Sequence, residues 1–116
     1  MKVKTKISCI NSLQEALLVV QEKPDIIEVI VETKSGVDVR SKSKEEAFII
    51  LDQVKRKVET CILTDKTEIN ELQKLLEGLP CDYIFPIFQL HNTVMKKIKI
   101  YFPYLKIVPT IHVVDR

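Results

Sequence analysis

Short apolar runs rich in β-branched residues alternate along this chain with segments whose apolar residues recur every three or four positions. The runs expected to form strands are residues 2–10, 26–31, 60–64, 83–90 and 107–114. Because the intervening spacing is typical of helices, the order is βαβαβαβαβ. Strict alternation predicts a parallel sheet built through right-handed crossovers, either doubly wound or part of a barrel. A site would then lie in the loops after the carboxyl ends of the strands.

Two of the expected helices begin at a capping-box sequence. Ser12 is followed three residues later by Glu15, and Ser43 by Glu46. In such a pair the serine hydroxyl accepts a hydrogen bond from the backbone N–H of the glutamate, whose side chain accepts one from the serine N–H. We therefore expect one helix to start at each serine, the second of them ending near Lys57.

The signals in the second half of the chain are less regular. Asp65 or Thr67 is expected to cap the third helix, and Gly78 to end it. Pro86 removes a backbone donor from the fourth apolar run, which argues for an edge strand, a bulge or a strand shorter than the run. The fourth helix is expected at residues 93–102.

Length and charge limit the classes of protein to which the chain can belong. Its 116 residues, 46% of them hydrophobic, suffice for one core but not for a complete eight-stranded α/β barrel, which takes about 250 residues. We therefore expect a single α/β domain over residues 1–116. The 18 basic and 16 acidic residues nearly cancel, so neither nucleic acid nor an anionic membrane is an expected partner. No segment approaches the ~20 apolar residues of a membrane span.

The three cysteines do not form a recognisable framework. Cys9, Cys61 and Cys81 are odd in number and share no short spacing such as Cys-x-x-Cys. This argues against structural disulfides and against a zinc site, so we expect no metal and a reduced, cytoplasmic location.

Several segments resemble phosphoribosylanthranilate isomerase. Residues 6–11 read KISCIN, whereas the first strand of that family usually reads Lys-Ile-Cys-Gly-Ile-Thr, and residues 13–16 match the helix that follows. Further similar segments keep the same order: 24–27 at strand two, 43–47 at helix two, 89–91 as the Gln-Leu-His after strand four, and 106–115 at strand five. The resemblance covers the whole chain but only the first half of a (β/α)8 barrel. It implies a half barrel with its strands in sequential order, rather than the order 2-1-3-4-5.

The resemblance also implies a reaction, an Amadori rearrangement in tryptophan biosynthesis that needs no cofactor. A general base removes the C2 proton of an aminoaldose phosphate, and a general acid assists ring opening. Ser8 stands where the family has its catalytic cysteine, and Cys9 follows it. A serine hydroxyl is far less acidic than a thiol, whose pKa is about 8.5. Cys9 could replace that base only if the register of the strand shifted by one residue, and such a shift sends a side chain to the opposite face of the sheet. The alternative is that Cys9 is a small buried hydrophobic residue.

Three residues are candidates for binding a phosphosugar substrate by the same resemblance. Arg40 is the only arginine in the loop after strand two, His91 could contact a substrate carboxylate or ring, and Gln89 belongs to the same Gln-Leu-His motif. The alternatives are a solvated loop charge for Arg40 and a helix-start residue for His91. The family's catalytic aspartate lies on strand six, to which Asp115 does not correspond.

The chain lacks a glycine-rich cradle for phosphate, because Gly36 has no second glycine nearby and Gly78 fits a helix end. We therefore expect an isomerase-like half barrel with little activity alone, completed by a second copy or by a complementing half-barrel chain. Open sheet edges favour such association. The alternative is a non-catalytic α/β binding or regulatory domain that self-associates.

Overall fold

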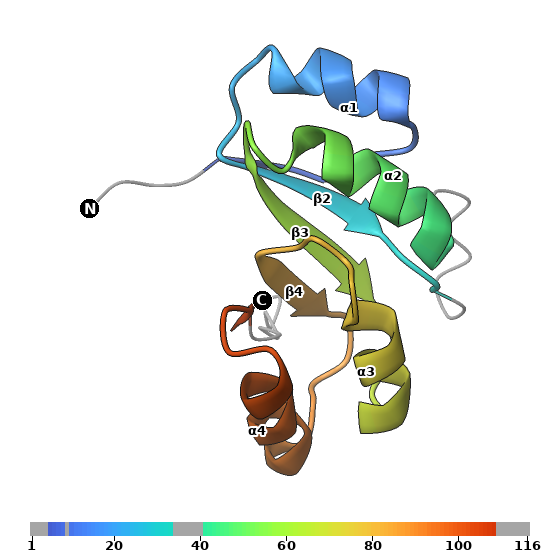
Figure 1. The fold of residues 1–116 in the computed structure, drawn as a ribbon, viewed down its shortest axis with the longest axis vertical. Coiled ribbons are helices and arrows are strands. Elements are labelled where there is room, and N and C mark those ends of the chain that lie inside the picture. Colours follow the sequence, from blue (N-terminus) through green and yellow to red (C-terminus); the bar gives the residue numbers. More distant parts are fainter. Residues whose placement is uncertain (1–4, 9, 34–40, 109–116) are drawn as a thin grey trace, which may run out of the picture.

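The computed structural model describes residues 5–8, 10–33 and 41–108, which form a five-stranded sheet with four helices along its outer side (Figure 1). The elements in chain order are β1 (Lys6–Ile7), α1 (Leu13–Val20), β2 (Ile26–Ile30), α2 (Lys44–Val54), β3 (Glu59–Thr64), α3 (Ile69–Leu76), β4 (Tyr83–Pro86), α4 (Asn92–Tyr101) and β5 (Lys106–Ile107). The predicted alternation of strands and helices is confirmed.

The strands lie side by side in sequence order, β1-β2-β3-β4-β5, and every neighbouring pair is parallel. Each helix crosses from one strand to the next and returns the chain in the same direction. This order confirms the barrel-type expectation and excludes the doubly wound order 2-1-3-4-5. All carboxyl ends of the strands therefore point to one edge of the sheet.

The two faces of the sheet have different chemistry because side chains alternate along each strand. Ile27, Val29, Ile62 and Ile84 face the helices and are fully buried in the core. The opposite face is here called the inner face. It carries polar and aromatic side chains of residues that lie beside one another on neighbouring strands. These include Glu28 beside Cys61, Cys61 beside Tyr83, and Tyr83 beside Lys106.

Both predicted serine caps are confirmed. The Ser43 hydroxyl accepts from the Glu46 N–H at 3.1 Å, and the Glu46 carboxylate accepts from the Ser43 N–H at 3.0 Å. Ser12 accepts from the Glu15 N–H at 3.1 Å, but the Glu15 carboxylate accepts from the N–H of residue 11 instead of Ser12. The first helix thus has the serine cap without the reciprocal bond, and the second has the complete box, although it ends at Val54, before Lys57.

The expected cap of the third helix was wrong. Asp65 and Thr67 belong to the connection from β3, and neither is the N-cap of α3. The N-cap is Glu68, whose side chain makes no capping hydrogen bond. The expected helix end is confirmed: Gly78 follows the last turn with φ +78°, a left-handed conformation that glycine adopts without strain. Pro86 is the last residue of β4, so the strand is shorter than the apolar run, as its missing donor suggested.

The two terminal strands are described over two residues each. Part of the expected first strand and most of the expected 107–114 strand lie outside the described residues, as do Cys9, Gly36 and Arg40. Within the described residues, no helix is both long and apolar enough to cross a membrane.

Candidate functional site

The residues that follow the strands lie along the carboxyl edge of the sheet. Ser8 follows β1, Glu32 lies just beyond β2, Lys66 follows β3 and Gln89 follows β4. Since parallel α/β folds place their sites at this edge, these residues and the adjoining inner face define the candidate site. The described residues contain no cluster of three or more potential metal-ligating side chains.

Ser8 is exposed directly beyond the last residue of β1. Ile7 and Ile10 both pack with the core although they lie three residues apart, so the side-chain alternation of β1 does not continue beyond Ile7 and does not fix the face of Ser8. The Ile10 N–H donates to the carbonyl of Glu28 at 3.1 Å, which keeps the chain beside β2 past this point. The position that matches the family's catalytic cysteine therefore lies at the carboxyl edge of the sheet and carries a hydroxyl, and its orientation toward the inner face stays a prediction.

The inner face contains a buried carboxylate, that of Glu28. Glu28 is only 3% exposed, and its Oε2 accepts from the Nζ of Lys6 at 3.2 Å and from the Sγ of Cys61 at 3.5 Å. The Lys6 ammonium also lies 4.6 Å from the centre of the Phe85 ring, a favourable cation–π position. Because an unpaired buried carboxylate is costly, these contacts make Lys6 a structural partner of Glu28.

Cys61 is not suited to replace the catalytic thiol that the family has at the position of Ser8. Burial raises the pKa of its thiol strongly, and the neighbouring Glu28 carboxylate raises it further. The thiol is thus protonated at neutral pH and serves as a weak hydrogen-bond donor. Burial likewise raises the pKa of Cys81 to about 12, with a smaller contribution from Asp82.

A second polar row crosses the inner face nearer the amino ends of the strands. The hydroxyl of Tyr83 donates to Glu59 Oε2 at 3.1 Å, and the ammonium of Lys106 lies 5.3 Å from the centre of the Tyr83 ring. The inner face therefore contains both acidic and basic groups, each with a partner on a neighbouring strand.

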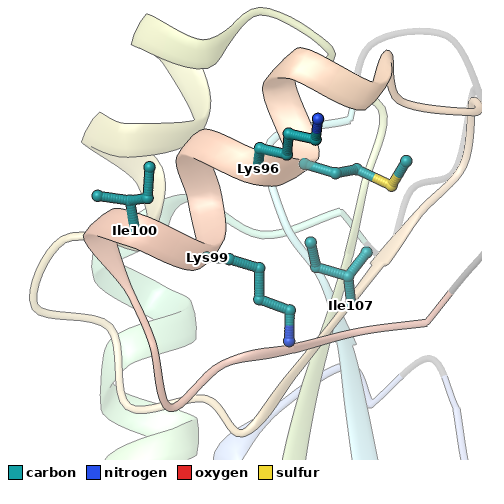
Figure 2. Close-up of a pocket in the computed structure, with 5 residues that line it drawn as sticks. Lys96, Lys99, Ile100 and Ile107 are labelled. Atoms are coloured by element: carbon teal, nitrogen blue, oxygen red, sulfur yellow. The ribbon is translucent and has the colours of Figure 1, made fainter.

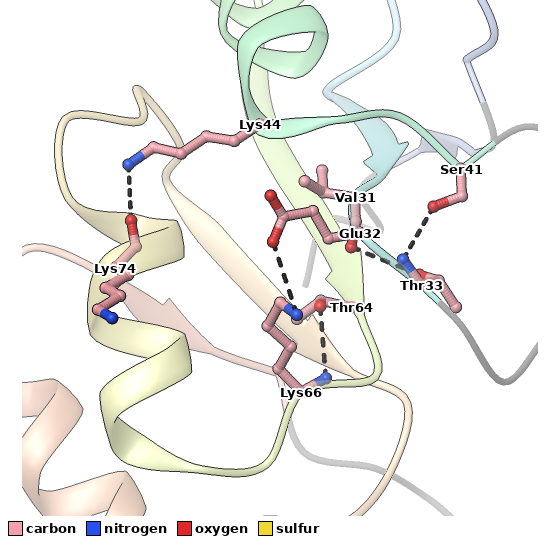
Figure 3. A network of polar contacts seen from close by, with 8 residues as sticks. All are labelled: Val31, Glu32, Thr33, Ser41, Lys44, Thr64, Lys66 and Lys74. Carbon is pink, nitrogen blue, oxygen red and sulfur yellow. Dashed lines mark hydrogen bonds and ion pairs between the residues drawn. The ribbon is translucent and has the colours of Figure 1, made fainter.

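The loops after β2 and β3 are joined by an ion pair (Figure 3). Lys66 Nζ lies 3.6 Å from Glu32 Oε1, and the Lys66 side chain is only 13% exposed. Glu32 has φ +50°, a left-handed conformation that is unfavourable for a residue with a side chain. Lys44 Nζ donates to the carbonyl of Lys74 at 2.6 Å on the same side. Lys66 and Lys44 thus each contact a group of the protein itself.

The two candidate binding residues after β4 are both exposed but differ in what they contact. His91 is the N-cap of α4: its Nδ1 accepts from the Thr93 N–H at 3.2 Å and lies 2.9 Å from the Thr93 hydroxyl. Gln89 lies in the connection from β4 to α4, one residue before the buried Leu90. The helix-start interpretation of His91 agrees with this geometry, whereas the substrate roles of His91 and Gln89 stay predictions.

Lys6 and Glu28 were not recognised from the sequence as a site pair. A signal was present, because Glu28 is the single charged residue inside the apolar run 26–31. A charge in a strand covered on both faces needs a buried partner. Spacing along the chain could not identify that partner, since it lies 22 residues away on the neighbouring strand.

Comparisons with known proteins show which fold this chain has. No protein-family model matches the sequence, and no curated protein matches it significantly. Among solved structures, phosphoribosyl anthranilate isomerase from Thermococcus kodakaraensis superposes with a TM-score of 0.74 and 16% identity, over 90% of this chain and 48% of that chain. N-(5'-phosphoribosyl)anthranilate isomerase from Pyrococcus furiosus also gives 0.74, with 20% identity over 96% of this chain and 55% of that chain.

The fold is that of half a phosphoribosylanthranilate isomerase barrel. The chain spans about half the length of the two solved isomerases. The sequence resemblance thus predicted the correct fold, and at such low identity the structural similarity extends to the fold alone.

Proposed function

We propose that this chain is a phosphoribosylanthranilate isomerase-like half barrel of tryptophan biosynthesis that depends on a partner and has little or no turnover alone. The observation that carries the proposal is the sheet itself. Its five strands match half of the isomerase fold, and among the described residues β1 and β5 each pair with one strand only. A barrel has no open edge, so the matching architecture is complete only when a complementing half pairs with both strands.

The residues at the site support low activity of the isolated chain. Ser8 replaces the thiol from which the family forms its base, and the buried Cys61 is held protonated. Loss of a positioned acid or base typically costs about 10²- to 10⁴-fold in rate. The lysines after β3 and at the start of α2 contact the protein itself, so binding energy that would orient a phosphosugar must come from elsewhere.

The substrate-binding part of the proposal concerns Gln89, His91 and Arg40, with Ser8 or Cys9 as the catalytic position. Gln89 and His91 follow β4 on the carboxyl edge, where a completed barrel would hold its substrate. The substrate class is an aminoaldose phosphate, and the reaction needs neither a metal nor an organic cofactor.

A steady-state isomerase assay of the pure chain, with substrate generated in place, tests this proposal. We expect no turnover above that of a heat-unfolded sample, with or without Ser8→Ala. Cys9→Ala is the matched variant for the neighbouring position. Robust turnover by the native chain that either substitution abolishes would refute the partner-dependent half barrel and indicate a working isomerase.

A non-catalytic binding or regulatory domain that self-associates is the second candidate. The observation in its favour is that His91 caps α4 through the ring nitrogen nearest Thr93, so it has a structural role without any ligand. Titration calorimetry with a phosphosugar analogue distinguishes the two functions. Binding that His91→Ala weakens without loss of α4 favours the isomerase-like site, whereas no binding favours the second candidate.

A further inference from the structure

The outer surface of α1 and α2 carries large apolar side chains that point away from the sheet. Leu18 of α1 is 64% exposed and Ile49 of α2 is 53% exposed, and Leu17 is exposed as well. Helical spacing places Leu18 on the side of α1 opposite the buried Ala16, and Ile49 on the side of α2 opposite the buried Ala47. The surface formed by Leu17, Leu18 and Ile49 is here called the α1–α2 patch. Its side chains contribute little to the core of one chain.

The two helices bring these side chains to one surface. α1 and α2 contact each other along the outer side of the sheet (Figure 1). A groove of about 350 Å³ near their amino ends is lined in part by Leu13 of α1 and Ile49 of α2, so Ile49 lies at the seam between the helices. The residues one turn before and one turn after Leu18 are Gln14 and Gln21, both exposed and uncharged. An apolar centre with few charges around it is typical of a protein–protein interface.

α3 indicates that the fold itself does not require exposed apolar residues in this layer. It lies on the same outer side of the sheet, and its exposed residues are Asn70, Glu71 and Lys74, all of them polar. The leucines of α1 and the isoleucine of α2 therefore favour a contact outside the chain.

α4 also exposes an apolar side chain, but at the open edge of the sheet. Ile100 is 73% exposed and lines a groove of about 580 Å³ together with Ile107 of β5 (Figure 2). The proposed half barrel would continue beyond β5, so a complementing half would cover this groove. The α1–α2 patch faces away from the sheet and would stay exposed in a completed barrel. It therefore calls for a partner surface of its own.

α2 carries opposite charges at the two ends of its outer side. Glu45 is exposed in the first turn, and Arg56 is exposed just beyond the C-cap Lys55, which still has helical backbone angles. Positions 45, 49 and 56 have the spacing of one helix face. We propose that a second copy of this chain covers the α1–α2 patch in a two-fold dimer, with α2 packed antiparallel on the partner's α2. Glu45 of each copy then lies opposite Arg56 of the other.

Charge favours a second copy as the occupant because the surface is complementary to itself. A two-fold rotation brings the acidic amino end of each α2 against the basic carboxyl end of the other, and it opposes the two helix dipoles favourably. A parallel contact of the two helices would instead place Glu45 near Glu45 and Arg56 near Arg56. Asp52, on the same side of α2, is already paired with Lys55 at 2.9 Å. This inference goes beyond the proposed function, since it does not depend on what completes the barrel.

Sedimentation of the native chain at micromolar concentration gives the first test. We expect a species of twice 13.4 kDa. Leu18→Asp and Ile49→Asp should each raise the dissociation constant at least about 100-fold, because each apolar contact is lost twice in a two-fold dimer. Ile100→Asp is the matched control, since it places the same charge on an exposed isoleucine at the sheet edge and should leave the dimer unchanged. Circular dichroism checks that each variant keeps its fold.

A charge exchange tests the antiparallel arrangement. Glu45→Arg and Arg56→Glu should each weaken the dimer about tenfold, and the double variant should recover most of the loss because opposite charges face each other again. A monomeric native chain, an unaffected dimer in Leu18→Asp, or no recovery in the double variant would each overturn the proposal. Dissociation by Ile100→Asp would also overturn it, because the dimer contact would then lie at the sheet edge. The isomerase assay tests the half barrel separately, since it measures turnover and not self-association.

Discussion

Lys6 and Glu28 form an ion pair of 3.2 Å across the first two strands, with the glutamate 3% exposed and the lysine side chain 32% exposed. The pair joins β1, an edge strand with only two described residues, to its neighbour β2. A polar interaction therefore helps to hold this edge strand in place.

Lys6→Met should destabilise the chain by about 1–3 kcal/mol, because Glu28 is left buried without its cation. The partial exposure of Lys6 limits the effect. Urea unfolding measures the difference. Lys6→Met combined with Glu28→Gln should recover part of the stability, since the uncompensated charge is removed. A double variant as unstable as the sum of the two single variants would show that the pair is not coupled.

The second prediction concerns acid and the cap of α2. Hydrogen bonds from the backbone and side chain of Ser43 lower the pKa of Glu46 below its ordinary 4.5. A carboxylate with a lowered folded pKa contributes stability above its unfolded pKa and loses that contribution as pH falls through the folded value. Thermal unfolding should therefore show a stability loss below pH 4.5 that Glu46→Gln reduces. Glu45→Gln, on the same turn without this cap, is the control, and an equal effect of both would contradict the assignment.

Both serine caps and the alternation of strands and helices were predicted from local spacing in the sequence, whereas the strand order was predicted only from the resemblance to phosphoribosylanthranilate isomerase. The start of α3 was missed because all four residues between β3 and α3, residues 65–68, carry charges or capping side chains, so the sequence offers several positions at which the helix could begin. Glu28 was missed for a different reason. Its partners Lys6 and Cys61 are brought to it by strand register, which no short motif encodes.

The candidate site was predicted only in part, because its residues came from a resemblance to a complete barrel. Ser8 lies exposed directly after β1, and its catalytic role stays a prediction. His91 shows the limit of that resemblance, since the same side chain that matches the family motif also caps α4. A motif match cannot separate these roles when both place the residue at the same helix start.

Gly78→Ala should cost about 1 kcal/mol for a backbone reason alone. The glycine has φ +78°, and a Cβ built there would meet no atom within 4 Å. The strain of a left-handed alanine is therefore the expected cause. Gly78→Asn is the matched variant, because asparagine tolerates this conformation better and should cost less. Equal losses for both variants in chemical unfolding would indicate a cause other than backbone conformation.

The last prediction tests which of two adjacent positions faces the inner face of the sheet. Ser8→Cys, made together with Cys9→Ala, introduces a thiol at the exposed position directly after β1, which we expect to lie on the side of Lys6. The nearby ammonium should lower the pKa of that thiol below its usual value of about 8.5, so alkylation at neutral pH should be fast. Cys61 and Cys81 should stay unreactive in the native state, because burial raises the pKa of both thiols. The pH dependence of iodoacetamide labelling gives the pKa, and Lys6→Met in the same background should raise it. If the thiol at position 8 is no more reactive than Cys61, or is insensitive to Lys6→Met, then position 8 does not face Lys6. Ser8 would then not occupy the place of the family's base.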